Sequence, residues 1–198
     1  MLLVCTANLC RSPMTEYLLR ARLRKLGISA TVASAGLLPG GYAPPPDGVR
    51  VMSDRGIDSS GHISRRFEAE MIKDADLIVG MAREHVRAVV LDIPDAWGRT
   101  FALKELVRRG EQVGPRAPEQ GLDEWLSDVG AGRRPADLMG SSLEDDVADP
   151  IGRSRDAWEQ VAAELSTLVD RLVDLIWTSS PRRGSSGHEG QEERSWAQ

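Results

Sequence analysis

A cysteine and an arginine stand six positions apart near the start of the chain, at Cys5 and Arg11. Cys5 closes an apolar run that predicts a buried strand. Arg11 is followed by Ser12 and Pro13, which suit the first turn of a helix, with Ser12 expected as the helix cap. The five residues between Cys5 and Arg11 are enough to curl the backbone so that successive N–H groups point at one anion. The sequence therefore predicts an anion cradle between a strand and a helix.

This cradle would hold a phosphate and activate a nucleophile at the same time. Arg11 can fork two hydrogen bonds onto phosphate oxygens, and the helix N-terminus adds partial positive charge at the same point. The same field favours ionisation of the Cys5 thiol, and the thiolate is the species that attacks. A Cys–Arg spacing alone is weak evidence, and a cysteine at a strand end is commonly a small core residue. The flanking strand and helix lead us to predict Cys5 as the nucleophile and Arg11 as the phosphate clamp.

A carboxylic acid is also needed, to give a proton to the leaving group and then to take one from water. An Asp-Pro pair late in the chain, Asp149 and Pro150, offers one. The residues alone do not separate Asp149 from Asp145 or Asp146, and an Asp-Pro pair is also a common turn before a helix.

Composition limits the class of protein. The 198 residues are 41% hydrophobic, enough for one domain with a real core. A net charge of −5 argues against a nucleic-acid partner. Two cysteines are too few for a disulfide framework, and no further Cys or His pair has zinc-ligand spacing, so we expect neither a metal nor a cofactor. No signal peptide or membrane-spanning run is visible, and we expect a cytoplasmic protein without a membrane partner.

Apolar runs and helical stripes alternate along the chain, which predicts an α/β fold. We expect three layers, with a four-stranded parallel sheet and helices on both faces, as in flavodoxin-like or Rossmann-like folds, and ligands at the carboxyl ends of the strands. The expected strands are 2–5, 30–34, 76–81 and 100–103, and the expected helices are 12–26, 47–55, 64–73, 83–90, 122–129 and 155–177.

The domain is expected to span residues 1–178. A segment at about 110–144, rich in Gly, Pro and charge, is expected to be an insertion over the sheet edge. Residues 179–198 lack the apolar content to fold, and we expect a disordered tail.

The run from Cys5 to Pro13, CTANLCRSP, resembles the signature loop of the low-molecular-weight protein tyrosine phosphatases. The resemblance covers about residues 1–178, and it continues through 34–36, 62–66, 76–78, Met81 and 149–150. It implies the phosphotyrosine phosphatase I type of fold and hydrolysis of a phosphate monoester through a phosphocysteine on Cys5. It also implies Asp149 as the acid, and a phosphotyrosine protein or a small aryl phosphate as the substrate. Ala7 departs from the pattern, since the family usually has Gly there.

Eight further residues are expected to bind phosphate or to support the loop: Thr6, Ala7, Asn8, Leu9, Cys10, Ser12, Ser34 and His62. Asn8 tolerates left-handed backbone and suits a role in shaping the loop. The resemblance implies that Ser34 and His62 brace the loop through Asn8, and that the Ser12 hydroxyl eases the departure of Cys5.

The sequence leaves the roles of Cys10, Ile151 and Tyr42 open, and it assigns no role at the site to His85 or His188. Cys10 either packs or forms a reversible disulfide with Cys5 under oxidant. Ile151 stands where the resembled family commonly has an aromatic residue, which puts stacking of a phenyl ring on that side in doubt, and Tyr42 is a candidate for the opposite wall. His85 is expected at the surface, and His188 falls in the tail.

Three other functions compete with the phosphatase. An arsenate reductase of the same fold could use the cradle with an external thiol, although a type that needs cysteines beyond Cys10 is excluded. A phosphotyrosine-binding module would not be expected to keep both a nucleophile and an acid. A flavin carrier would leave Cys5 and Arg11 without a purpose. The oligomeric state is not predicted.

Overall fold

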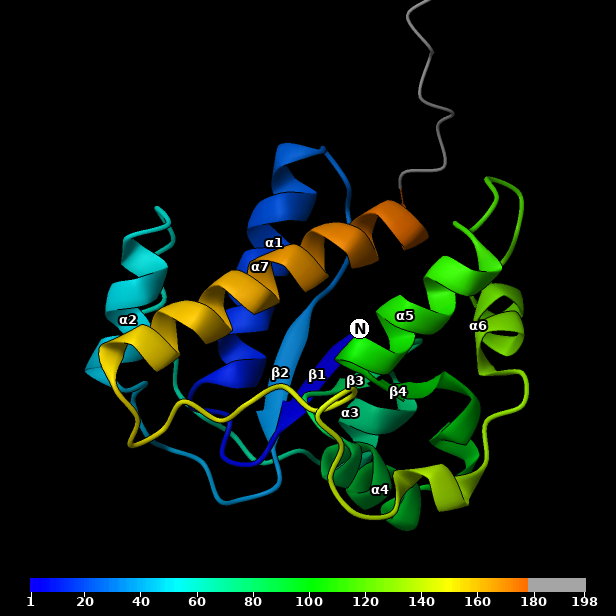
Figure 1. The fold of residues 1–198 in the computed structure, drawn as a ribbon, viewed down its shortest axis with the longest axis horizontal. Coiled ribbons are helices and arrows are strands. Elements are labelled where there is room, and N and C mark those ends of the chain that lie inside the picture. The colour runs from blue at the N-terminus through cyan, green and yellow to red at the C-terminus, as the bar shows by residue number, and fades with distance from the viewer. Residues whose placement is uncertain (178–198) are drawn as a thin grey trace, which may run out of the picture.

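Four parallel strands form one sheet in the computed structural model, which describes residues 1–177 (Figure 1). The strands are β1 (Leu2–Cys5), β2 (Ala33–Gly36), β3 (Ile78–Gly80) and β4 (Thr100–Ala102), in the spatial order β2-β1-β3-β4. In the register, Cys5 of β1 pairs with Gly36, and Val4 pairs with Gly80. The predicted fold class is confirmed.

Helices cover both faces of the sheet. They are α1 (Arg11–Lys25), α2 (Pro46–Ser53), α3 (Ala69–Lys73), α4 (Arg83–Asp92), α5 (Leu103–Val113), α6 (Leu122–Gly130) and α7 (Arg155–Ile176), with 3-10 turns η1 (Pro94–Arg99) and η2 (Pro135–Leu138). In Figure 1, α7 crosses the front of the molecule over α1, and α4 lies at the bottom of the view, below β3 and β4. None of these helices within residues 1–177 combines the length and hydropathy that a membrane crossing requires.

Alternate residues of β1 belong to two separate cores. Leu3 and Cys5 pack in the large core shared with α1, α5 and α7. Leu2 and Val4 pack in the smaller core, which includes Val89 of α4. This two-residue period is the pattern of a strand covered on both faces, and it places Cys5 at the edge where the next residues leave the sheet.

Two expected elements differ clearly from the structure, and one helix was not expected. The second strand is β2 at Ala33–Gly36 rather than 30–34, and the expected helix 64–73 is helical only in α3. The chain before α3 is extended because it forms two backbone hydrogen bonds with Gly36 of β2. Gly36 N donates to Arg65 O, and Phe67 N donates to Gly36 O, each at 2.8 Å. Helix α5 was not expected. Its buried stripe begins at Leu103, a residue that the sequence assigns to the strand predicted at 100–103.

The segment predicted as an insertion is well packed at the edge of the sheet beside α5. Trp125 of α6 is fully buried, and its Nε1 donates to Gly114 O at 2.9 Å. Gly110 lies inside α5, and a Cβ there would come within 3.0 Å of the side chains of Trp125 and Leu175. Glycine therefore allows α6 and α7 to approach α5 closely. The tail predicted at 179–198 lies outside the described residues.

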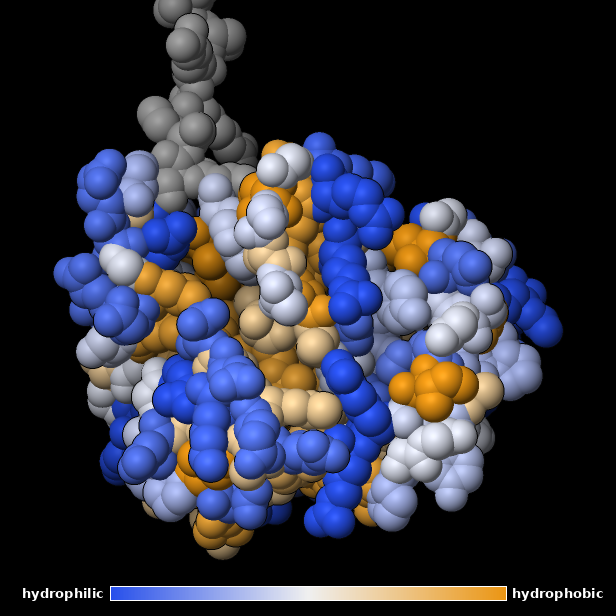
Figure 2. Space-filling model, turned by 180° about the vertical axis from the view of Figure 1, so that it is seen from behind, coloured by the Kyte–Doolittle hydropathy of each residue, from blue (hydrophilic) through white to orange (hydrophobic). Residues whose placement is uncertain are grey.

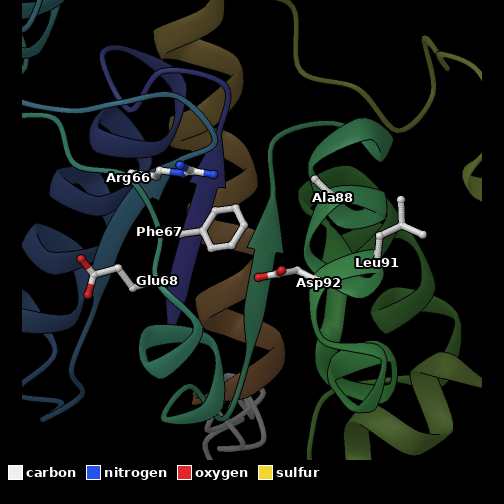
Figure 3. Close-up of a pocket in the computed structure, with 6 residues that line it drawn as sticks. All are labelled: Arg66, Phe67, Glu68, Ala88, Leu91 and Asp92. Atoms are coloured by element: carbon white, nitrogen blue, oxygen red, sulfur yellow. The ribbon is translucent and has the colours of Figure 1, made fainter.

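The back of the molecule carries a hollow (Figure 2). Figure 2 shows apolar residues along a hollow in this face, between more hydrophilic borders. One pocket lies between the extended segment before α3 and the helix α4, with Phe67 directed toward it (Figure 3); its lining is Arg66, Phe67, Glu68, Ala88, Leu91 and Asp92. The residues of the smaller core are themselves buried, and Phe67, which packs against that core, is only partly buried and lines the pocket.

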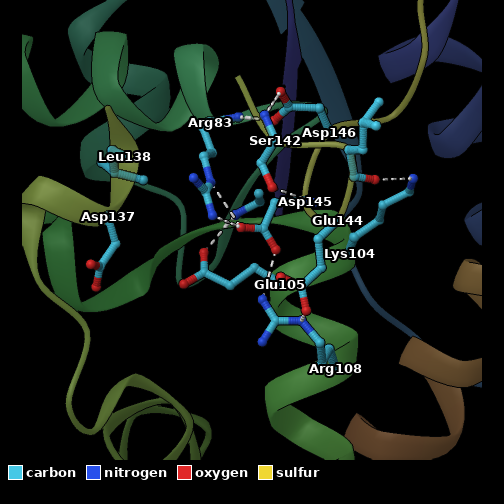
Figure 4. A network of polar contacts seen from close by, with 12 residues as sticks. Arg83, Lys104, Glu105, Arg108, Asp137, Leu138, Ser142, Glu144, Asp145 and Asp146 are labelled. Carbon is cyan, nitrogen blue, oxygen red and sulfur yellow. Dashed lines mark hydrogen bonds and ion pairs between the residues drawn. The ribbon is translucent and has the colours of Figure 1, made fainter. Parts of the chain in front are cut away.

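Asp145 anchors the long loop that precedes α7 (Figure 4). Its Oδ2 accepts from Arg83 Nε at 2.8 Å and NH2 at 2.6 Å, and its Oδ1 accepts from Arg108 NH2 at 2.7 Å. The neighbouring Asp146 accepts from the backbone N of Arg83 at 2.8 Å, and Val147 N donates to Met81 O at 2.8 Å. The loop is thereby tied to the ends of β3 and α4 and to the side of α5.

Replacing Asp145 by Asn should lower the free energy of unfolding at neutral pH by about 2 kcal/mol, because two arginines lose a buried, charged acceptor. Burial raises the pKa of Asp145, but the hydrogen bonds from Arg108 and Arg83 outweigh it and hold the pKa below the ordinary 3.8. Stability from a depressed carboxyl pKa is present above the unfolded value and is lost as the pH falls through the folded value. The difference between wild type and Asp145→Asn should therefore shrink below pH 3.8.

Urea denaturation at pH 7 and near pH 3 would measure this difference. The matched control is Asp92→Asn at the exposed end of α4, which should change the stability by less than about 0.5 kcal/mol. An equal loss in the two variants at pH 7 would contradict the anchoring role.

Candidate active site

The predicted cradle is formed by residues 6–10, between the end of β1 at Cys5 and the start of α1 at Arg11. The helix begins one residue earlier than expected, with Cys10 at the N-cap and no side-chain capping bond. The prediction that Ser12 caps the helix is wrong: Ser12 lies inside the first turn. Its hydroxyl points back to the cysteine, as the resemblance implied.

The sulfur of Cys5 receives two hydrogen bonds. Asn8 N donates to Sγ at 3.2 Å, and Ser12 Oγ donates to it at 3.0 Å. Cys5 is 2% exposed, so these donors act where little water competes with them. Both contacts come from donors that can stabilise negative charge on the sulfur.

Asn8 shapes the loop. It is fully buried and has φ 54°, the only positive φ of a non-glycine residue within residues 1–177. Its Nδ2 donates to Ser34 Oγ at 2.8 Å and to Ser12 Oγ at 3.0 Å, and its Oδ1 accepts from Arg65 N at 3.0 Å. The methyl group of Ala7 therefore meets no left-handed backbone strain.

Two further contacts hold the Asn8 backbone. His62 Nε2 lies 2.8 Å from Asn8 O, and since a carbonyl only accepts, His62 is the donor. Gly36 lies against the loop so closely that a Cβ there would come within 2.7 Å of Asn8 N and 2.8 Å of the carbonyl carbon of Ala7. Ser34 and His62 thus both lie against Asn8, where the resemblance placed them.

Arg11 is nearly buried and faces the same cradle. Its NH2 donates to Asp149 Oδ2 at 2.5 Å and to Thr6 Oγ1 at 3.2 Å, and its NH1 donates to Val147 O at 3.3 Å. Its Nε is buried and has no partner. An entering oxyanion can bind this free N–H and replace Asp149 on NH2, which gives the two-point contact that a guanidinium makes with phosphate.

The structure separates the three candidate acids. Asp145 and Asp146 are engaged in the loop anchor, whereas Asp149 alone contacts Arg11. Its side chain is 42% exposed, and its Oδ1 accepts from Ile151 N at 3.1 Å. Asp149 is therefore the carboxylate that can reach a group bound in the cradle.

Cys10 is a second free thiol beside the cradle, 2% exposed. Burial raises its pKa, and the negative charges of Asp149 and Cys5 raise it further, so the thiol is protonated at neutral pH. Its Sγ lies 3.7 Å from Asp149 Oδ1. A reversible disulfide with Cys5 stays a prediction.

The remaining expectations have mixed outcomes. The side chains of Thr6 and Leu9 are half-buried at the cradle, and those of Tyr42 and Ile151 are 61% and 46% exposed. The surface position expected for His85 is wrong, because this residue is fully buried with its Nε2 3.0 Å from Thr6 Oγ1. The sequence does contain a signal for this burial, because His85 lies on the apolar stripe of α4. His188 lies outside the described residues.

Metal ligands do not gather at the cradle or elsewhere within residues 1–177: no three His, Cys, Asp or Glu side chains are arranged to hold an ion.

Comparisons with known proteins agree with this geometry. The family model of the low molecular weight phosphotyrosine protein phosphatases matches residues 1–123. A low molecular weight protein-tyrosine-phosphatase of Acinetobacter johnsonii is 39% identical over 102 residues, which are 52% of this chain and 70% of the relative. A protein-arginine-phosphatase of Bacillus subtilis is 27% identical over 175 residues, 87% of this chain and 93% of the relative.

Solved structures extend the likeness beyond the matched region. A low molecular weight protein tyrosine phosphatase from T. tengcongensis superposes with a TM-score of 0.67 at 31% identity, covering 87% of this chain and 96% of that one. The arginine phosphatase from Geobacillus stearothermophilus superposes with a TM-score of 0.63 at 28% identity, covering 87% and 89%.

Two variants of Asn8 should separate its backbone conformation from its side-chain bonds. Asn8→Gly removes the bonds but keeps the freedom to adopt positive φ, whereas Asn8→Ala loses both. We expect the Ala variant to be less stable than the Gly variant by about 1 kcal/mol, and both to bind inorganic phosphate at least about 10-fold more weakly than wild type. Urea denaturation and isothermal titration calorimetry with phosphate measure the two effects. Wild-type phosphate affinity in both variants would show that Asn8 does not shape the cradle.

Proposed function

Because the chain belongs to the low molecular weight phosphotyrosine protein phosphatase family, we propose that it hydrolyses phosphate monoesters, phosphotyrosine foremost, through a phosphocysteine on Cys5. The observation that carries this mechanism is that one loop holds Cys5, whose sulfur accepts from Asn8 N and Ser12 Oγ, and leads directly into Arg11, which contacts Asp149. A cytoplasmic location is part of the proposal, since a reactive thiol stays reduced there.

In the first step, the phosphate of the substrate lies in the loop and is held by backbone N–H groups and Arg11. The Cys5 thiolate forms a bond to phosphorus as the bond from phosphorus to the phenolic oxygen breaks. The protonated Asp149 gives its proton to that oxygen, so that a neutral phenol leaves. Arg11 and the loop N–H groups stabilise the charge that spreads over the equatorial oxygens.

In the second step, water attacks the phosphorus of the phosphocysteine. Asp149, now a carboxylate, takes the proton of the water, and the bond between phosphorus and sulfur breaks. Cys5 departs as a thiolate, which the Ser12 hydroxyl and Asn8 N–H stabilise. Inorganic phosphate leaves, and both Cys5 and Asp149 have returned to their starting forms.

The family assignment favours this reaction over the alternatives. An arsenate reductase could use the same cradle, but the matching family and the relatives named above are phosphatases. A binding module without turnover would need neither the sulfur nor the acid.

The substrate class is the less constrained part of the proposal. Relatives named for phosphotyrosine and for phosphoarginine both align with most of this chain. Ile151 after the Asp-Pro pair is exposed and has no aromatic ring, and Tyr42 is exposed in the loop that follows β2. Comparison of kcat/KM on one peptide carrying phosphotyrosine or phosphoarginine decides between them, and a preference for phosphoarginine would overturn the assignment to phosphotyrosine.

Replacement of the nucleophile and of the acid should have different signatures. With EDTA present, wild type should hydrolyse para-nitrophenyl phosphate, and Cys5→Ser should be inactive. Asp149→Asn should lower kcat by about 10²–10⁴-fold, the range of a lost general acid. This loss should be larger for phenyl phosphate, whose leaving group needs the proton more.

Inorganic phosphate provides the control for Asp149. Because the variant removes a carboxylate that occupies Arg11, phosphate should inhibit Asp149→Asn at least as strongly as wild type. A loss of kcat that is independent of the leaving group, together with weaker phosphate binding, would show a structural role. No hydrolysis by wild type would refute the phosphatase.

A further inference from the structure

His85 is a buried titratable residue that the mechanism above does not use. It lies in the first turn of α4 and is fully buried. Its Nε2 lies 3.0 Å from Thr6 Oγ1, and its Nδ1 is buried without a hydrogen-bond partner. Burying a half-satisfied imidazole costs more than burying an apolar side chain of similar size. This cost indicates that the contact between His85 and Thr6 has a function.

Thr6 connects His85 to the phosphate clamp. Arg11 NH2 donates to Thr6 Oγ1 at 3.2 Å, so the hydroxyl lies between the guanidinium and the imidazole. The Thr6 backbone is held independently, because its carbonyl accepts from Leu37 N at 2.8 Å and from Leu38 N at 3.0 Å. His85 therefore acts on the orientation of the Thr6 side chain and not on the Thr6 backbone.

The end of β3 provides the space for His85. Gly80 closes that strand, and a Cβ there would come within 3.1 Å of His85 Cβ and 3.0 Å of Val86 Cγ2. Glycine thus lets the first turn of α4 approach the cradle. Burial, and then the charge of Arg11, lower the pKa of His85 to about 3, so the imidazole is neutral at physiological pH.

The position of the ring hydrogen follows from the neighbours of the two nitrogens. Nε2 faces two oxygens, Thr6 Oγ1 at 3.0 Å and Glu84 Oε1 at 3.4 Å, whereas Nδ1 has no acceptor within residues 1–177. A buried N–H without an acceptor is rarer than a buried acceptor without a donor. The hydrogen is therefore on Nε2, and Thr6 Oγ1 accepts from both His85 and Arg11.

We propose that His85 is a positioning residue that acts through the Thr6 hydroxyl to hold the guanidinium of Arg11 in the orientation that binds phosphate. The role matters most when an anion enters, because the anion displaces Asp149 from Arg11 and the contact with Thr6 remains. The kinetic side of this inference rests on the proposed function, but phosphate binding tests it without turnover.

Paired substitutions test the hydrogen bond apart from packing. His85→Gln can place an amide nitrogen near the position of Nε2, whereas His85→Leu fills the site without a donor. We expect His85→Leu to weaken the Kd of inorganic phosphate, measured by calorimetry, by about 10-fold, and His85→Gln to stay within about threefold of wild type. Thr6→Val should resemble His85→Leu, and Thr6→Ser should resemble wild type. KM for an aryl phosphate should rise in the same order.

A double-mutant cycle tests whether the two residues act on one path. If they do, His85→Leu combined with Thr6→Val should bind phosphate no more weakly than the poorer single variant. Val89→Ala is the matched control, since Val89 is fully buried on the same helix but packs in the smaller core. Val89→Ala should lower the stability of the protein but should bind phosphate with the affinity of wild type.

Three results would overturn the proposal: phosphate affinity within twofold of wild type in His85→Leu, no rescue by Gln, or losses that multiply in the double variant. Should the Leu variants not fold, the imidazole ¹⁵N shifts of His85 in the wild type decide. They must show the neutral Nε2–H form and must change when phosphate binds. If wild type binds phosphate with the expected dependence on His85 but hydrolyses no ester, the proposed function fails while the positioning role stands.

Discussion

The left-handed backbone of Asn8 is the constraint on which the site depends. A loop of five residues can turn its N–H groups toward one anion only if the chain reverses its curvature, and a positive φ at Asn8 does this. For a residue with a Cβ this conformation costs about 1–2 kcal/mol. Three side-chain hydrogen bonds and the His62 contact to the Asn8 carbonyl offset that cost. The conformation of the loop is therefore held by contacts within the protein.

Those bonds also explain the arrangement around the cradle. Asn8 binds Ser34 on β2, Ser12 on α1 and the backbone of Arg65, so three separate elements must meet at one side chain. The segment containing Arg65 is extended because its backbone forms hydrogen bonds with both Asn8 and Gly36. In a helix, the same backbone groups would form hydrogen bonds within the helix instead. Gly36 has no side chain because the loop occupies the space of its Cβ. The site thus sets local structure that helical propensity alone would not predict.

The sequence predicted the features that residues close together in the chain determine. It missed the features that depend on contacts between residues far apart in the chain. The strand, the loop and the helix that carry Cys5 and Arg11 lie within one short stretch, and the position of Cys5 at the end of β1 was predicted correctly. The choice of Asp149 needed the resemblance, because only tertiary contacts show that Asp145 is tied to Arg83. The burial of His85 was missed for the same reason, since its partner Thr6 is 79 positions away in the chain.

Charge compensation of Arg11 links binding to acid catalysis in the proposed mechanism. Arg11 is nearly buried, and a buried guanidinium without a partner is costly, so a carboxylate beside it stabilises the structure. Asp149 is that carboxylate, and its side chain stays 42% exposed because it lies on a loop at the mouth of the cradle. A phosphate that binds Arg11 replaces this negative charge and repels it, so the carboxylate leaves Arg11. In the proposed mechanism the same side chain serves the leaving group, so charge compensation of Arg11 and acid catalysis are two roles of one residue.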